Sequence, residues 1–156
     1  MWGTIAPLAA ALKSAGGAAN RRGQNGGVTL PAQTTVLSIG LHPSTIDYSK
    51  IPDLDLATMT ARIEAGNAAL RAAGLDVVTC LVPTDPDTAE AAVRAQLAEQ
   101  TFGLAMIGGG VRMMPEHTLL FERLINTIAE LSPGIRYAFN SSPETTIDAI
   151  RRWVGA

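Results

Sequence analysis

The sequence predicts a single α/β domain built around a parallel β-sheet. Short apolar runs rich in β-branched residues alternate with segments in which apolar residues recur at a helical period. Strands that alternate with helices need crossover connections, so the strands are expected to run parallel, with helices on both faces of the sheet. A chain of 156 residues is long enough for one ordinary hydrophobic core, and the sequence shows no internal repeat.

The first half of this domain contains two expected strands with a helix between them. The run TVLSIGL at 35–41 is apolar and β-branched, which is typical of a strand buried on both faces. The run VVTCLV at 77–82 predicts the second strand. Between them a helix is expected at 56–73, with Gly74 placed to end it and apolar residues at Met59, Ile63, Leu70 and Ala73.

The middle of the chain continues the alternation. A helix is expected at 88–100, capped by Asp87 with Glu90 at the capping-box spacing. A third strand is expected at 102–107, and it leads directly into three consecutive glycines.

The last elements follow the same pattern. A third helix is expected at 115–131 because Pro115 suits its first turn and apolar residues form a stripe along it. The run RYAF at 136–139 predicts the fourth strand. Ser142 is expected to cap a final helix that reaches 154.

Four strands joined by right-handed crossovers leave few possible topologies. The simplest is a doubly wound, three-layer sheet with strand order 2-1-3-4, which is similar to the flavodoxin-like and Rossmann-like class. In this order strands one and three are neighbours at the point where the winding direction reverses. The loops that follow them should face one another there, at the usual ligand site of an open parallel sheet.

Composition excludes several classes of protein. Twelve basic and fourteen acidic residues give a net charge of −2, which argues against a dedicated nucleic-acid-binding protein. No apolar run approaches the roughly 18 residues of a membrane span. A single cysteine, Cys80, rules out an internal disulfide and a cysteine-based zinc site, and it favours a reducing, cytoplasmic location. Because Cys80 lies in the middle of a strand, we expect it to be a buried small hydrophobe.

Residues 1–33 differ from the rest of the chain. They contain basic residues but no acid, and they end in a run rich in glycine and asparagine. We expect a flexible leader at 1–33, with a possible short helix at 4–13, followed by the α/β domain at 34–156. An organellar presequence and a secretory signal are the alternatives, and the composition matches each of them poorly.

Gly108, Gly109 and Gly110 follow the third strand and are expected to bind an anion. Residues without Cβ can adopt left-handed backbone angles and point successive N–H groups into one concavity. The start of the next helix adds positive potential, and Arg112 can donate two hydrogen bonds to a phosphate- or carboxylate-type ligand. Alternatively, the glycines only turn the chain and let Arg112 reach a surface carboxylate. The segment lacks both the P-loop pattern and a GxGxxG after the first strand, which disfavours ordinary NAD binding.

His42 and His117 are the two histidines of the chain, and both are expected at the same edge of the sheet. Histidine exchanges protons near neutral pH, so either one is a candidate general base, with Glu116 as a neighbouring catalytic candidate. In the alternative interpretation, His42 only bonds its loop backbone and His117 faces water in a helical turn. No metal site is predicted, because the two histidines and Asp47 or Glu116 come from separate loops.

Two further features bear on partners. Asn140 and Ser141 follow the fourth strand and are expected to orient a bound ligand. The helix at 115–131 carries a wider apolar arc than one sheet face needs, which predicts a homodimer formed through this helix.

The sequence therefore favours a small enzyme or enzyme-like domain that binds an anionic small molecule, with His42 or His117 moving a proton. A non-catalytic metabolite- or nucleotide-binding module and an oligomeric interaction protein remain the alternatives. The identity of the ligand, the reaction and any cofactor do not follow from these residues.

Overall fold

The computed structural model describes residues 29–155, in which four parallel strands form one sheet. Along the sheet the order is β2 (Val77–Val82), β1 (Val36–Leu41), β3 (Leu104–Ile107) and β4 (Arg136–Phe139). The predicted order 2-1-3-4 is confirmed. Since β1 pairs with both β2 and β3, the winding direction reverses between β1 and β3.

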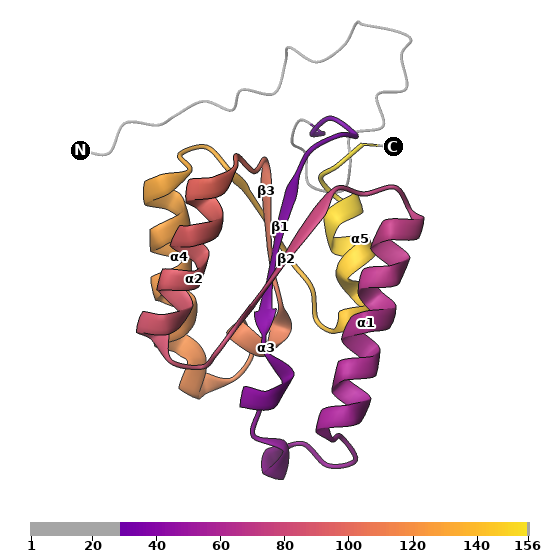
Figure 1. Ribbon diagram of the computed structural model, residues 1–156, viewed down its shortest axis with the longest axis vertical. Coiled ribbons are helices and arrows are strands. Elements are labelled where there is room, and N and C mark those ends of the chain that lie inside the picture. The colour runs from indigo at the N-terminus through magenta and orange to yellow at the C-terminus, as the bar shows by residue number, and fades with distance from the viewer. Residues whose placement is uncertain (1–28, 156) are drawn as a thin grey trace, which may run out of the picture.

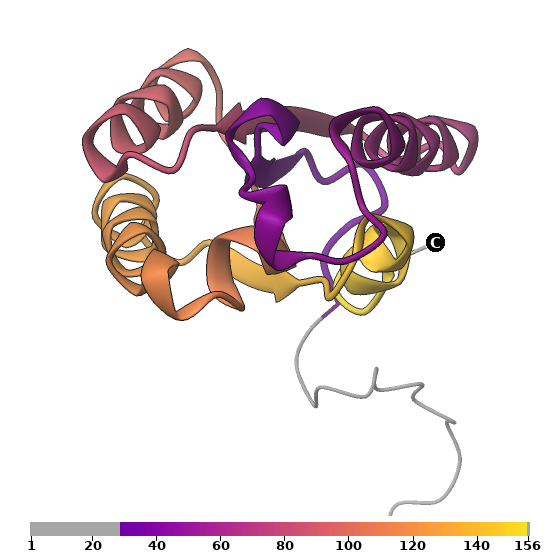
Figure 2. The ribbon, with the colours of Figure 1, turned by 90° about the horizontal axis from the view of Figure 1, so that it is seen from below.

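Helices cover both faces of this sheet. On one face lie α1 (Leu56–Ala72) and α5 (Thr146–Arg151), and on the other lie α2 (Pro86–Glu99) and α4 (Thr118–Leu131) (Figure 1). Figure 2 shows the same three layers while looking onto the carboxyl edge of the sheet. The chain thus has a three-layer, doubly wound α/β fold of the flavodoxin-like class.

Short helical turns occupy the carboxyl edge, where the loops leave the strands (Figure 2). After β1 come the 3-10 turns η1 (Pro43–Thr45) and η2 (Tyr48–Lys50). After β3 come the single-turn helix α3 (Gly109–Arg112) and the 3-10 turn η3 (Pro115–His117). After β4 comes the 3-10 turn η4 (Pro143–Thr145).

The central strand β1 separates two hydrophobic cores, which explains why it is apolar on both faces. Alternate residues Leu37, Ile39 and Leu41 belong to the core beneath α2 and α4. On the other face, Val36 belongs to the core beneath α1 and α5, together with Met106 of β3. The side-chain period of a strand therefore places Ser38 and Gly40 on the α1 side of the sheet.

The N-terminus of α2 corrects one prediction. Asp85, rather than Asp87, is the cap residue, since its carboxylate accepts hydrogen bonds from the backbone N–H of Thr88 at 2.9 Å and from its hydroxyl at 2.6 Å. Pro86 occupies the first helical position, where its missing N–H costs no hydrogen bond. Asp87 lies in the first turn and pairs with Arg123 of α4 at 2.7 Å.

The helix expected at 115–131 is interrupted at its start. Met114 is extended, with φ −96° and ψ 127°, because a residue that precedes proline is disfavoured in the helical region. The chain then makes the turn η3, and the regular helix α4 begins at Thr118.

Most of the apolar arc of α4 is buried within the chain. Leu120, Leu124 and Ile128 are fully buried in the core between the sheet and the α2–α4 layer. Of the apolar residues that predicted a dimer, Leu119 and Leu131 remain substantially exposed, at 55% and 43%.

The two ends of the described chain are joined. The last helix stops at Arg151 rather than near 154, because Val154 forms a parallel bridge with Leu30. The N–H of Leu30 donates to the carbonyl of Trp153 at 2.7 Å, and the N–H of Gly155 donates to the carbonyl of Leu30 at 2.8 Å.

Most of the leader predicted at 1–33, including the helix suggested at 4–13, lies outside the described residues. Among the residues that are described, no helix is long and apolar enough to cross a membrane.

Candidate functional site

A groove runs along the carboxyl edge of the sheet at the point where the winding reverses. Its inner cavity, about 220 Å³, lies between α1 and the sheet and also contacts the segments that follow β3 and β4. Its outer cavity, about 470 Å³, lies between the β1–α1 loop and the segment from Gly109 to His117. The two cavities together form one groove, which we call the edge groove. Five lining residues are common to both cavities: Leu41, Ile46, Met59, Gly109 and Gly110.

The inner cavity exists because small residues face one another across it. Ser38 and Gly40 of β1 line the cavity on the sheet side. Gly66 of α1 lines it on the helix side, next to the turn η4. A Cβ on Gly66 would lie 3.1 Å from the carbonyl oxygen of Pro143, which is a tight contact, so glycine favours the close approach of α1 to η4. A sheet-facing surface of small residues leaves volume that a well-packed core would fill.

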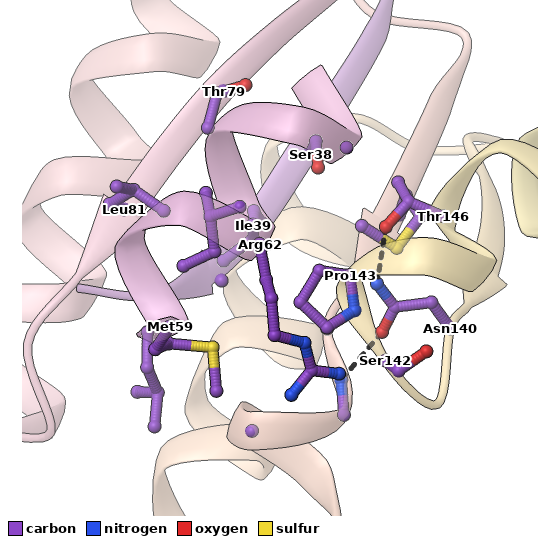
Figure 3. A pocket seen from close by; sticks show the side chains of 18 of the residues that line it. Ser38, Ile39, Met59, Arg62, Thr79, Leu81, Asn140, Ser142, Pro143 and Thr146 are labelled. Atoms are coloured by element: carbon purple, nitrogen blue, oxygen red, sulfur yellow. Dashed lines mark hydrogen bonds between the residues drawn. The ribbon is translucent and has the colours of Figure 1, made fainter. Parts of the chain in front are cut away.

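Neutral polar side chains form part of the cavity wall (Figure 3). Ser38 is paired in register with Thr79 of β2 and with Met106 of β3, so these three side chains lie in one row across the sheet. The hydroxyl of Thr79 contacts the Asn67 side chain of α1 at 3.4 Å, at the long limit of a hydrogen bond. Ser38, Asn67 and Thr79 are not among the residues predicted from the sequence, although a serine and a glycine on one face of an apolar strand are a visible signal.

The three glycines after β3 line the inner cavity, but none of them has the left-handed backbone angles that the sequence predicts. Gly108 is extended, with φ −69° and ψ 153°, and Gly109 and Gly110 open the helical turn α3. The N–H of Gly108 donates to Ile39, and that of Gly109 donates to the Asn140 side chain, both at 2.8 Å. Two of the three amides are therefore already bonded within the protein.

Close packing explains two of these glycines. A Cβ on Gly108 would lie 3.3 Å from the carbonyl oxygen of Ile39, and a Cβ on Gly109 would lie 3.2 Å from that of Ser141. The end of a flexible side chain can move away from such a contact, but a backbone atom cannot move as easily. The glycines serve the close approach of the β3–α3 segment to its neighbours.

Arg112 has a structural role in this geometry and lines neither cavity. Its guanidinium donates to the carbonyl oxygen of Asn140 at 2.5 Å and lies 5.3 Å from the centre of the Phe139 ring. Its Nε is buried and has no hydrogen-bond partner among the described residues. Among the described residues Arg112 pairs with no carboxylate; its guanidinium fastens α3 to the end of β4.

Asn140 connects the segments that follow β3 and β4. Its side-chain oxygen accepts from Gly109, its amide donates to the hydroxyl of Thr146 at 2.7 Å, and its carbonyl accepts from Arg112. Asn140 is 7% exposed and lines the inner cavity, as does Ser141. Both therefore lie at the edge where the sequence predicts, and the hydrogen bonds of Asn140 link the segments that form this part of the cavity wall.

His117 lies at the outer cavity with one nitrogen fixed. Its Nδ1 is 2.8 Å from the carbonyl oxygen of Gly110. A carbonyl can only accept, so Nδ1 carries the hydrogen, and the Nε2 of the neutral ring keeps its lone pair. This tautomer can take up a proton from a bound molecule.

His42 has the opposite tautomer and a different position. Its Nδ1 accepts from the backbone N–H of Ser44 at 3.2 Å and lies 2.7 Å from the Ser44 hydroxyl. Nδ1 therefore carries no hydrogen in the neutral ring, and Nε2 is a donor. His42 caps the turn η1, is exposed, and lines neither cavity.

Charged residues close the outer cavity. Lys50 of η2 pairs with Glu116 of η3 at 2.9 Å, which joins the loop after β1 to the segment after β3. The two loops thus face one another, as predicted. The Lys50 ammonium lowers the pKa of Glu116, so this carboxylate is ionised at neutral pH and suits an electrostatic role better than that of a proton donor.

The remaining candidates lie away from the groove. Cys80 is buried beneath the α2–α4 layer, and burial raises the pKa of its thiol, which disfavours the reactive thiolate. Within residues 29–155, no group of three or more histidine, cysteine, aspartate or glutamate side chains could hold a metal ion.

No protein-family model matches this chain, and comparisons with curated proteins and with solved structures found no significant match.

Proposed function

We propose that this protein binds a small organic molecule in the edge groove and that His117 exchanges a proton with it. The groove carries the proposal: it lies at the switch point between β1 and β3, where open parallel sheets bind ligands, and it leads to a histidine with a free nitrogen. Asn140 and the close-packed glycines supply a hydrogen-bonded wall on one side of the groove.

The anionic ligand favoured by the sequence loses two of its supports. The amides of Gly108 and Gly109 and the guanidinium of Arg112 are bonded within the protein. The proposal therefore rests on the groove and on His117. Which ligand charge the groove accepts depends on the residues that line the inner cavity.

A non-catalytic binding module is the second candidate. The inner cavity favours it, because Arg62 is the one ionisable side chain among the described residues that line this cavity. The two candidates differ in what His117 does: binding by a sensor survives its removal, whereas turnover by an enzyme does not.

The homodimer through 115–131 also remains a proposal, supported by the exposed Leu119 and Leu131. Light scattering of the wild type and of Leu119→Glu tests it. A dimeric wild type and a monomeric variant would support this interface, and a monomeric wild type would refute it.

The experiment for the groove is ligand-observed NMR with a library of small polar fragments. The Gly40→Val variant places a side chain into the inner cavity, where a Cβ would meet only Leu81, at 3.7 Å. Ala98→Val on the exposed side of α2 is the matched control for added bulk. We expect fragments that bind the wild type and the control but not Gly40→Val. Fragments that bind all three proteins equally, or none at all, would refute the proposed site.

A further inference from the structure

The inner cavity is lined by a hydroxyl that has no hydrogen-bond partner among the described residues. Ser38 is only 7% exposed, yet its side chain makes no hydrogen bond to any described residue. It lines the cavity from the middle of the central strand β1 (Figure 3). Since this hydroxyl is not used within the protein, it is available to donate a hydrogen bond to a ligand in the cavity or to accept one from it.

The charge at the rim of this cavity is already neutralised. The Arg62 guanidinium donates from Nε to Glu144 at 2.6 Å and from Nη2 to the other carboxylate oxygen at 2.8 Å. This fork lowers the pKa of Glu144 to about 2, so the carboxylate remains ionised and paired at neutral pH. An anionic ligand would have to displace a carboxylate that already holds two charge-assisted bonds.

The other polar groups of the wall are uncharged. Asn67 and Thr79 offer an amide and a hydroxyl that can donate and accept, whereas the Asn140 side chain is already bonded to Gly109 and Thr146. No aromatic ring is found among the described lining residues. The apolar side chains of the wall are aliphatic or thioether groups, which include Met59, Ile63, Leu81 and Met106. The volume, about 220 Å³, is below the roughly 300–1,000 Å³ of sites for drug-sized molecules.

We infer that the inner cavity selects a small, uncharged aliphatic molecule that bears a hydroxyl or carboxamide group, with Ser38 as its hydrogen-bonding anchor. This inference rests on the proposed function and specifies the ligand class of the same groove. The alkyl part packs against the Met59 and Leu81 side of the cavity, and the polar group replaces the missing partner of Ser38.

A series of compounds with one carbon skeleton tests the charge requirement. Isovaleramide, 3-methyl-1-butanol, isovalerate and 3-methylbutylamine differ in their polar group, and only the last two are charged at pH 7. Binding is measured by titrating the 15N-labelled full chain with each compound and following the amide shifts of Gly40, Gly108 and Gly109. We expect the amide and the alcohol to bind at least several-fold more tightly than the carboxylate and the amine.

Two variants test the assigned residues. Ser38→Ala removes one hydrogen bond without adding bulk, and we expect isovaleramide to bind roughly three- to tenfold more weakly. Glu144→Ala frees the Arg62 guanidinium, and we expect isovalerate to bind more tightly while isovaleramide is little affected. Thr60→Val, on α1 outside the lining of the inner cavity, is a control for loss of a hydroxyl.

The outcomes distinguish failure of the inferred ligand class from failure of the proposed binding site. If isovalerate binds the wild type as tightly as isovaleramide, or if Ser38→Ala leaves isovaleramide binding unchanged, the ligand class is refuted while the groove remains a binding site. If none of the four probes shifts the amides that line the groove, both the ligand class and the proposed site are refuted.

Discussion

The variant Gly40→Ala is expected to make the protein more stable, in contrast to most substitutions in a central strand. Gly40 lies in β1, and a Cβ built on it would meet a single neighbour, the Leu81 side chain at 3.7 Å, which is an ordinary contact. Replacing a strand glycine by alanine recovers about 0.5–1 kcal/mol of backbone entropy. The added methyl group is only partly buried, so it contributes a fraction of the roughly 0.8 kcal/mol assigned to a buried methylene.

Together these terms predict a gain of about 1 kcal/mol in the free energy of unfolding. For a domain of this size that corresponds to a rise in Tm of about 3–5 °C. The measurement is urea denaturation and calorimetry of the full-length wild type and variant.

Gly108→Ala is the matched control, because it adds the same methyl group on the adjacent strand end. Its Cβ would lie 3.3 Å from the carbonyl oxygen of Ile39 and 3.6 Å from the Cα of Gly40. Neither backbone atom can move freely, so we expect a loss of about 1–3 kcal/mol. A Gly40→Ala variant that is less stable than the wild type would show that the cavity beside β1 is not the open space described above.

The remaining predictions concern the charged and titrating groups. In 15N NMR of the neutral rings, His117 should show protonated Nδ1 and His42 protonated Nε2; the same tautomer in both would contradict the assigned hydrogen bonds. Because Arg62 lowers the pKa of Glu144 from 4.5 to about 2, the pair stabilises the fold above pH 4.5, and this contribution is lost as the pH falls toward 2. Glu144 is 55% exposed, so solvent screening limits the contribution to about 0.5–1 kcal/mol, and urea denaturation of Glu144→Gln should show a loss of that size at pH 7 and none near pH 2. Arg112→Ala should cost about 2 kcal/mol in ligand-free protein by the same assay, since it removes a charged donor from Asn140; unchanged stability would reject its structural role.

The sequence was sufficient to predict the fold because periodicity reports local backbone structure and burial. The apolar β-branched run of β1 predicted a strand buried on both faces, and the alternation of strands and helices predicted the parallel sheet with order 2-1-3-4. Given that order, the predicted meeting of the β1 and β3 loops followed, and the Lys50–Glu116 pair confirms it.

Element boundaries were less predictable, because competing local signals must be weighed against one another. Asp85 and Asp87 both suit a helix cap, and the position of Pro86 decides between them. The extended residue before Pro115 likewise interrupts a helix that the apolar pattern alone continues.

Only the tertiary structure decided which groups meet. Arg112 donates to an atom 28 positions away in the chain, and Arg62 pairs with a carboxylate 82 positions away. The carbonyl that determines the tautomer of His117 belongs to a different helical turn. Such partners depend on how elements cross and how closely they pack, and no local pattern encodes either. The inner cavity could not be predicted for the same reason. Ser38 and Gly40 are visible in the sequence, but the space between them and α1 depends on where α1 packs against the sheet.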